Sequence, residues 1–167
     1  TEVIENADGG INAFLDPSTR KPGLLTGFHD FDWYTLGLFP EQLVILAARP
    51  SMGKTALALN IAAYCAEKQA APVAIFSLEM DRASLAARLV CARARINLLD
   101  YRAGRLQKDE RARLQKATAE MCDLPIFIDD KSGAELGSIR KKIERMKATH
   151  GLGLGVIDYL QLMGTRK

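Results

Sequence analysis

Residues 43–62 constrain the fold of this chain more than any other stretch. An aliphatic run, Leu43–Ala48, is followed by a short turn that ends in Gly53-Lys54-Thr55 and then by an apolar segment. This order predicts a strand, a phosphate-binding loop and a helix. The loop pattern is small-x-x-x-x-Gly-Lys-Thr, with Ala48 at the position where the usual motif has glycine.

The predicted loop has the chemistry of a nucleotide site. Loops of this kind point backbone N–H groups at a helix N-terminus, where the partial positive charge favours a phosphate. Lys54 would reach the outer phosphates, and the Thr55 hydroxyl would be a ligand of Mg²⁺. The alternative is a glycine-capped turn with a surface lysine. The candidate nucleotide-binding residues are Ala48, Arg49, Pro50, Ser51, Met52, Gly53, Lys54 and Thr55.

The chain length and charge fit one domain and do not by themselves indicate a partner. The 167 residues carry 23 basic and 20 acidic side chains. The basic residues gather in 81–116 and 131–150, which suits an interface or an anionic ligand, although a solvated helix face is the commoner explanation. The three cysteines suggest buried free thiols of a reducing compartment. Without a signal-peptide start or an apolar run that would span a membrane, a cytoplasmic location is expected.

Strand-like and helix-like segments alternate along the chain. Residues 1–25 contain several breakers and are expected to be a linker or arm, and residues 26–41 to be irregular, with aromatic side chains over the edge of a core. Expected helices cover residues 54–68, 81–96, 109–121 and 132–150, with a connector at 98–107, and expected later strands cover 73–78, 125–128 and 154–157. Such alternation predicts an α/β fold with a mostly parallel sheet covered by helices on both faces.

Acidic residues follow each of the later expected strands. In parallel sheets, ligands bind beyond the carboxyl ends of the strands, so Glu79, Asp129-Asp130 and Asp158 should lie at the edge that holds the loop. Asp158 is the candidate partner of Mg²⁺ together with Thr55; the alternative is a strand-end cap. Glu79 is either the group that activates the attacking water or a carboxylate favouring a helix N-terminus. Capping of the following helix is the more economical account of Asp129 and Asp130.

Four ordered motifs resemble the RecA-like motor domain of DnaB-type replicative DNA helicases, and the resemblance covers residues 26–163. They are Ala48-Arg-Pro-Ser-Met-Gly-Lys-Thr55, Phe76-Ser-Leu-Glu-Met80, Ile128-Asp-Asp130 and Val156-Ile-Asp-Tyr-Leu-Gln-Leu-Met163. The resemblance implies a RecA-like P-loop NTPase core that uses ATP and Mg²⁺, with Glu79 and Lys54 as catalytic residues and Thr55 and Asp158 at the metal. It also implies a homo-hexamer that moves along single-stranded DNA, with primase and a helicase loader as candidate partners.

Some features depart from the family pattern. Leu36 and Glu41 stand where glycine is frequent, and the family's sensor glutamine, DNA-gripping loops and arginine finger would lie beyond Lys167. The fold is therefore expected to be incomplete at its C-terminus, with slow ATP hydrolysis. Only weak, salt-sensitive DNA binding is expected, through the helices of residues 82–116.

Two alternatives remain beside the helicase interpretation. Another RecA-like ATPase, of the recombinase or clock-protein type, would share the lead-in segment and the glutamate, although residues 159–162 favour the helicase. A non-catalytic module that binds nucleotide and serves only in assembly would share the fold. The expected division is an arm at 1–25 and the N-terminal part of an ATPase domain at 26–167.

Overall fold

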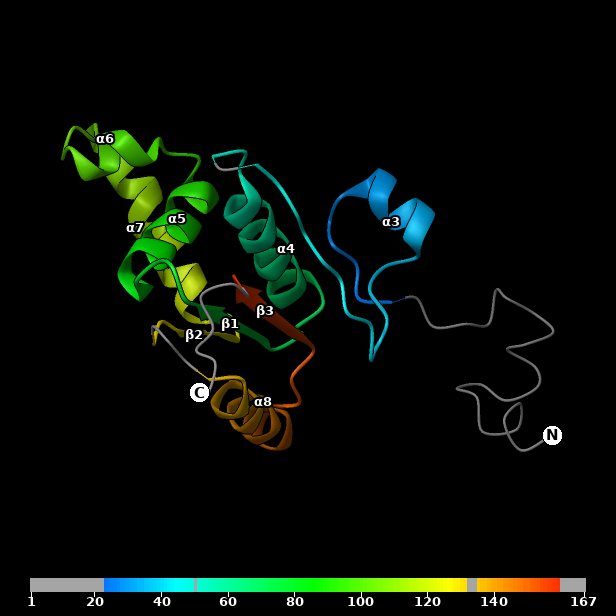
Figure 1. Cartoon of the computed structure of the whole chain (residues 1–167). Helices are drawn as coiled ribbons and strands as arrows, with labels where there is room; N and C mark the ends of the chain where they lie inside the picture. Colours follow the sequence, from blue (N-terminus) through cyan, green and yellow to red (C-terminus); the bar gives the residue numbers. More distant parts are fainter. Residues whose placement is uncertain (1–22, 50, 132–134, 160–167) are drawn as a thin grey trace, which may run out of the picture. The chain divides into compact units, whose positions relative to one another are not determined.

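The computed structural model describes residues 23–49, 51–131 and 135–159 (Figure 1). The chain divides into two compact units, Thr1–Leu43 and Val44–Lys167. The expected arm at 1–25 lies almost entirely outside the described residues.

The described part of the first unit is built around one short helix, α3 (His29–Thr35). The Asp32 carboxylate accepts hydrogen bonds from the backbone N–H groups of Thr26 (2.8 Å) and Gly27 (2.9 Å) and from the Thr26 hydroxyl (2.7 Å). These bonds fold the lead-in segment back onto the helix, and Thr26 is buried. The expectation of irregular structure over 26–41 was therefore wrong for α3, where acidic residues in the first turn favour a helix.

In the described residues of the second unit, three strands form a parallel sheet with the order β2-β1-β3. The central strand β1 (Val73–Ser77) is buried along its whole length, and β2 (Ile126–Asp129) and β3 (Leu154–Asp158) flank it. Parallel neighbours require crossover connections, which here pass through helices. Because Ser77 pairs with Asp158 in the register, the carboxyl ends of β1 and β3 lie next to each other.

Helices cover both faces of this sheet (Figure 1). One face carries α4 (Lys54–Lys68) and α5 (Arg82–Ala94), and α7 (Lys108–Cys122) packs beside α5. The other face carries α8 (Leu136–His150). Side chains alternate along β1 as the strand period requires: Ala74 and Phe76 face Ile139 of α8.

The expected strand over 43–48 was wrong. Residues 43–49 form no regular element, and Leu43 and Ile45 are 83% and 73% exposed. An aliphatic run becomes a strand only where a neighbouring strand takes up its backbone hydrogen bonds, and in the described part of the chain this run has no such neighbour.

The other expected elements were close to those observed. α4 has the expected bounds; β1 and β3 begin where expected and end one residue away, and β2 is shifted by one residue at both ends. The expected connector at 98–107 contains a further short helix, α6 (Leu98–Arg102), which the Asn97 side chain caps by accepting the N–H of Leu99 at 2.8 Å. Residues 132–134, the expected start of the last helix, lie outside the described part.

No helix among the described residues is long and apolar enough to cross a membrane.

Candidate nucleotide site

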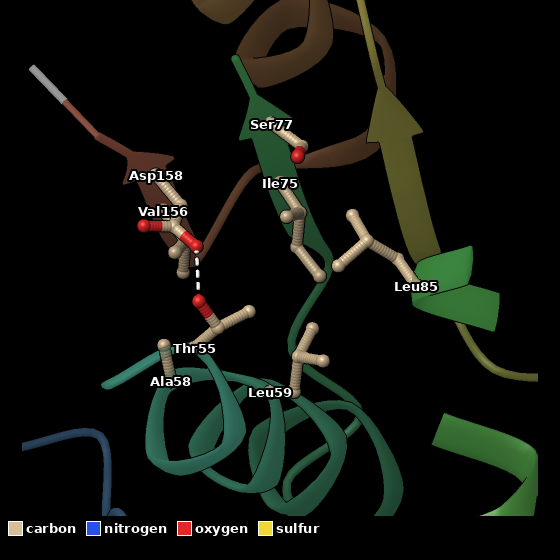
Figure 2. A pocket seen from close by; sticks show the side chains of 8 residues that line it. All are labelled: Thr55, Ala58, Leu59, Ile75, Ser77, Leu85, Val156 and Asp158. Atoms are coloured by element: carbon tan, nitrogen blue, oxygen red, sulfur yellow. Dashed lines mark hydrogen bonds between the residues drawn. The ribbon is translucent and has the colours of Figure 1, made fainter. Parts of the chain in front are cut away.

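The centre of the site is a contact between two residues that are 103 positions apart in the sequence. The Thr55 hydroxyl donates a hydrogen bond of 2.6 Å to Oδ2 of Asp158 (Figure 2). Lys54 Nζ lies 2.8 Å from the other carboxylate oxygen, Oδ1. Adjacent residues at the start of α4 therefore contact both oxygens of the strand-end aspartate.

The backbone around the site explains why these residues meet. Gly53 has φ +86°, in the left-handed region that glycine adopts most readily, and α4 begins at the next residue. Asp158 ends β3, and its carbonyl oxygen accepts the N–H of Leu78 at 2.7 Å. The helix start therefore lies at the carboxyl ends of β1 and β3, where the sequence places it.

Burial makes the contacts of Asp158 necessary. The residue is only 7% exposed, and a buried carboxylate without partners would be costly. The ammonium group of Lys54 and the hydroxyl of Thr55 satisfy it together. Lys54 Nζ also lies 4.2 Å from the centre of the Tyr159 ring, where a cation–π attraction adds to the ion pair.

A small cavity lies beside this contact (Figure 2). Its polar lining comes from Thr55, Ser77 and Asp158, and its apolar lining is Ala58, Leu59, Ile75, Leu85 and Val156. The hydroxyl of Ser77 donates to the carbonyl of Met80 at 2.7 Å and accepts the N–H of Met80 at 3.1 Å. This pair of bonds fixes the turn that carries Glu79.

Glu79 lies in that turn, at the same edge of the sheet. Its side chain is exposed, and within the described part of the chain no hydrogen bond or ion pair holds it. It does not cap the next helix, because Asp81 does so by accepting the N–H of Ser84 at 2.8 Å. The hydrogen bonds from Ser84 also hold the pKa of Asp81 below its usual value. The Glu79 side chain therefore lies in solvent at this edge of the sheet.

The rest of the loop is open to solvent. Ala48, Arg49, Ser51, Met52 and Gly53 are exposed, and Pro50 lies outside the described residues. Gly53 at the N-cap has no side chain to cap α4, none of the described side chains is found to do so, and no acidic residue lies in the first turn of the helix. Its backbone N–H groups and Lys54 therefore present a positive end that suits a phosphate.

The expectation that Asp129 and Asp130 cap the following helix was wrong. Asp130 accepts the backbone N–H of Arg82, at the start of α5, at 2.9 Å, and this bond holds its pKa below the usual value. Asp129 forms an ion pair with Lys142 in the middle of α8. The two carboxylates connect the end of β2 to helices on opposite faces of the sheet, so their position at the strand end has a structural explanation.

The donor set at Asp158 fits Mg²⁺. This ion takes oxygen ligands, keeps several of its waters and needs only one or two protein groups. The Thr55 hydroxyl and the Asp158 carboxylate are oxygen donors in direct contact, whereas the described residues contain no cage of three or more acidic, histidine or cysteine side chains. The residues present therefore suit a metal ion that arrives with a nucleotide better than one bound by protein alone.

Sequence reasoning missed two features of the site. It assigned Lys54 to phosphate only, whereas the structure also pairs it with Asp158. It gave no role to Tyr159, although an aromatic residue directly after a strand-end aspartate is a usable signal when a lysine is expected nearby.

The fold defines the class of this protein: it is an α/β domain of RecA-like type, with the start of α4 at the carboxyl ends of β1 and β3. The family of the DnaB-like helicase C terminal domain matches residues 23–167. The chain belongs to this family.

Individual relatives agree with this membership. The chain is 42% identical over 162 residues to "Replicative DNA helicase DnaB" of Geobacillus stearothermophilus, covering 97% of the chain and 34% of the relative. It is 45% identical over 141 residues to "Replicative DNA helicase DnaC" of Bacillus subtilis (strain 168), covering 84% of the chain and 31% of that relative. The chain thus spans about a third of the length of these relatives.

Solved structures show the same fold. "The Structure Of A DnaB-Like Replicative Helicase And Its Interactions With Primase" superposes with a TM-score of 0.87 at 31% identity, over 94% of this chain and 38% of that chain. "ATPase Domain of G40P" superposes with a TM-score of 0.85 at 30% identity, over 94% of this chain and 57% of that chain.

Proposed function

We propose that this chain is the nucleotide-binding part of the motor domain of a hexameric replicative DNA helicase, and that it binds and hydrolyses ATP with Mg²⁺. The observation that carries the proposal is the joining of Lys54 and Thr55, at the start of α4, to Asp158 at the end of β3. A strand-end aspartate beside a phosphate loop is the arrangement that phosphoryl-transfer sites of this kind use.

Each residue receives a role from its position. Residues 48–55 would surround the phosphates with backbone N–H groups, and Lys54 would contact the outer ones. Thr55 and Asp158 would hold the Mg²⁺ ion, which, when bound, neutralises charge on the phosphate oxygens. Glu79 would orient and deprotonate the attacking water, because it is exposed at the same edge and unpaired among the described residues.

The wider assignment rests on the family and on the names of the relatives. Residues 1–25 would form an arm and residues 26–167 the N-terminal part of the ATPase domain, in a cytoplasmic homo-hexamer. Single-stranded DNA would be the track along which the ring moves. The name of one similar structure mentions primase, which makes primase a partner to test together with a helicase loader.

Nucleotide binding tests the site directly. Lys54→Ala should abolish binding of ATP and of a non-hydrolysable analogue, measured by titration calorimetry. Lys108→Ala is the matched control, because Lys108 is an exposed lysine at the start of another helix. Unchanged affinity in Lys54→Ala would show that the site is assigned wrongly.

Hydrolysis separates a motor from a passive assembly module. Single-turnover hydrolysis, with and without single-stranded DNA, should be stimulated by the DNA, and Glu79→Gln should remove turnover while binding is kept. Nucleotide binding without any turnover in the parent chain would favour the passive module instead.

A further inference from the structure

Two neighbouring residues at the end of β3 hold the side chain of Lys54. Its Nζ atom lies 2.8 Å from Oδ1 of Asp158 and 4.2 Å from the centre of the Tyr159 ring. An ammonium group has three N–H donors, and the Lys54 side chain is 27% exposed. A carboxylate on one side and an aromatic face on another therefore leave part of the ammonium group open to solvent at the start of α4.

The two contacts act differently on the charge of Lys54. The Asp158 carboxylate carries a negative charge, so a phosphate has to compete with it for the ammonium group. The Tyr159 ring attracts the cation through the negative face of its π system and carries no net charge. The ring therefore restrains the lysine without neutralising it, and the charge of Lys54 stays available to a phosphate.

The ring is the part of Tyr159 that makes this contact. In the described part of the chain the hydroxyl of Tyr159 forms no hydrogen bond or ion pair. The residue is half-buried, and it is not one of the residues that line the small cavity at Thr55 and Asp158. Neither a hydrogen bond nor the filling of that cavity explains its position beside Lys54.

A lysine that is already held in place favours the binding of a ligand. A long side chain loses much of its rotamer freedom when it becomes immobilised. Where the free protein has already restricted the side chain, less of this entropy is lost on binding, and the affinity is higher.

We propose that Tyr159 is a positioning residue for Lys54: its ring keeps the ammonium group at the start of α4, where the phosphates of a nucleotide would bind. This inference rests on the proposed function, in which Lys54 contacts the outer phosphates. Tyr159 acts through Lys54 and through the negative face of its ring, so a side chain of similar size without that face cannot replace it.

The test varies the electronic character of the ring and keeps its shape. Tyr159→Phe removes the hydroxyl and keeps the π face. One, two or three fluorine atoms on that phenylalanine, incorporated by nonsense suppression, weaken the negative face with little change in volume. Tyr159→Leu removes the face altogether, and Tyr101→Leu, at a partly exposed tyrosine of α6, is the control. A non-hydrolysable ATP analogue is titrated into the whole chain by calorimetry in excess chelator.

The expected result is an affinity that follows the strength of the π face. Tyr159→Phe should bind the analogue within about twofold of the parent chain. Tyr159→Leu should bind it about two- to fivefold more weakly, which corresponds to a cation–π contact that solvent partly reaches. The logarithm of the affinity should fall with each added fluorine, whereas a ring that only fills space would not respond to fluorination.

A double-mutant cycle checks the contact without any nucleotide. Urea unfolding is measured for the parent chain, Lys54→Met, Tyr159→Leu and the combined variant. The loss of Asp158's ion pair is common to both variants that carry Lys54→Met, so it cancels in the comparison. Tyr159→Leu should change the unfolding equilibrium constant about two- to fivefold more with Lys54 present than in the Lys54→Met background.

Four results would overturn the proposal. They are an unchanged affinity in Tyr159→Leu, an equal loss in Tyr101→Leu, an affinity that does not depend on fluorination, and a cycle without coupling. Failure of the proposed function is read separately from Lys54→Ala. Unchanged nucleotide binding by Lys54→Ala contradicts the proposed function, whereas loss of binding by Lys54→Ala with unchanged binding by Tyr159→Leu contradicts only the role of Tyr159.

Discussion

The pairing of Lys54 with Asp158 predicts that metal-free nucleotide binds more tightly to Asp158→Asn than to the parent chain. A phosphate must compete with the carboxylate for the ammonium group of Lys54, because Nζ lies 2.8 Å from Oδ1 of Asp158. Asparagine keeps the size of the side chain and a carbonyl acceptor for Thr55, but it removes the negative charge. The competing contact is therefore weakened without opening a cavity.

The magnitude follows from the burial of the pair. A hydrogen bond to a charged group contributes a net 1.5–3 kcal/mol or so. The Lys54 side chain is 27% exposed and that of Asp158 9%, so solvent reaches the ammonium end and the lower part of that range applies. About 1.5 kcal/mol corresponds to roughly a tenfold tighter dissociation constant. In the presence of Mg²⁺ this gain in nucleotide affinity should vanish or reverse, because Asp158→Asn also removes the carboxylate proposed to hold the metal.

The assay is titration calorimetry with an adenine nucleotide, once in excess chelator and once in excess Mg²⁺. Asp130→Asn is the control, since Asp130 lies at the same sheet edge but contacts Arg82. Equal or weaker metal-free binding by Asp158→Asn, in a protein whose unfolding midpoint is unchanged, would refute the competition between carboxylate and phosphate.

Three further predictions concern the stability and reactivity of the second unit. Burial alone would raise the pKa of Asp129, but the hydrogen bond from Lys142 is the main cause that holds this pKa below its usual value. Asp129→Asn should therefore lower the free energy of unfolding at neutral pH. Urea titrations should show this difference disappearing as the pH falls through the lowered folded-state pKa. Ile139→Ala should lower the free energy of unfolding by about 2–5 kcal/mol, because Ile139 is 1% exposed. The measurement is a lower urea midpoint with an unchanged slope of the free energy against urea concentration. A loss of stability near zero would contradict the packing of α8. Ellman's reagent should modify the exposed Cys122 quickly in the folded chain, and Cys91 only after unfolding. Cys91 is buried, and burial raises the pKa of its thiol. Equal modification rates for the two thiols in the folded chain would contradict this prediction.

The sequence predicted elements best where local and tertiary signals agree. Gly53 before a run of helix formers defines the start of α4, and the run Val73–Ser77 is apolar on both faces, as a central parallel strand must be. The segment 43–48 has the same aliphatic character but no described strand beside it. Composition cannot reveal whether a partner strand is present. The expectation of three buried thiols was wrong for Cys122 for a related reason, since helix periodicity alone does not show which side of α7 is covered.

The candidate site could be predicted in position but not in its charge pairing. The rule that parallel strands present their carboxyl ends at one edge placed Thr55 and Asp158 together across 103 residues. The same rule also grouped Asp129 and Asp130 with them, yet these carboxylates pair with Lys142 and with the start of α5. Strand order and connectivity fix which residues reach an edge, whereas the choice of partner depends on which cation the packing of the helices brings within reach. A strand-end carboxylate without a cation partner among the described residues, such as Glu79, is therefore the better candidate for chemistry. Asp158, which a lysine already neutralises, is the better candidate for binding.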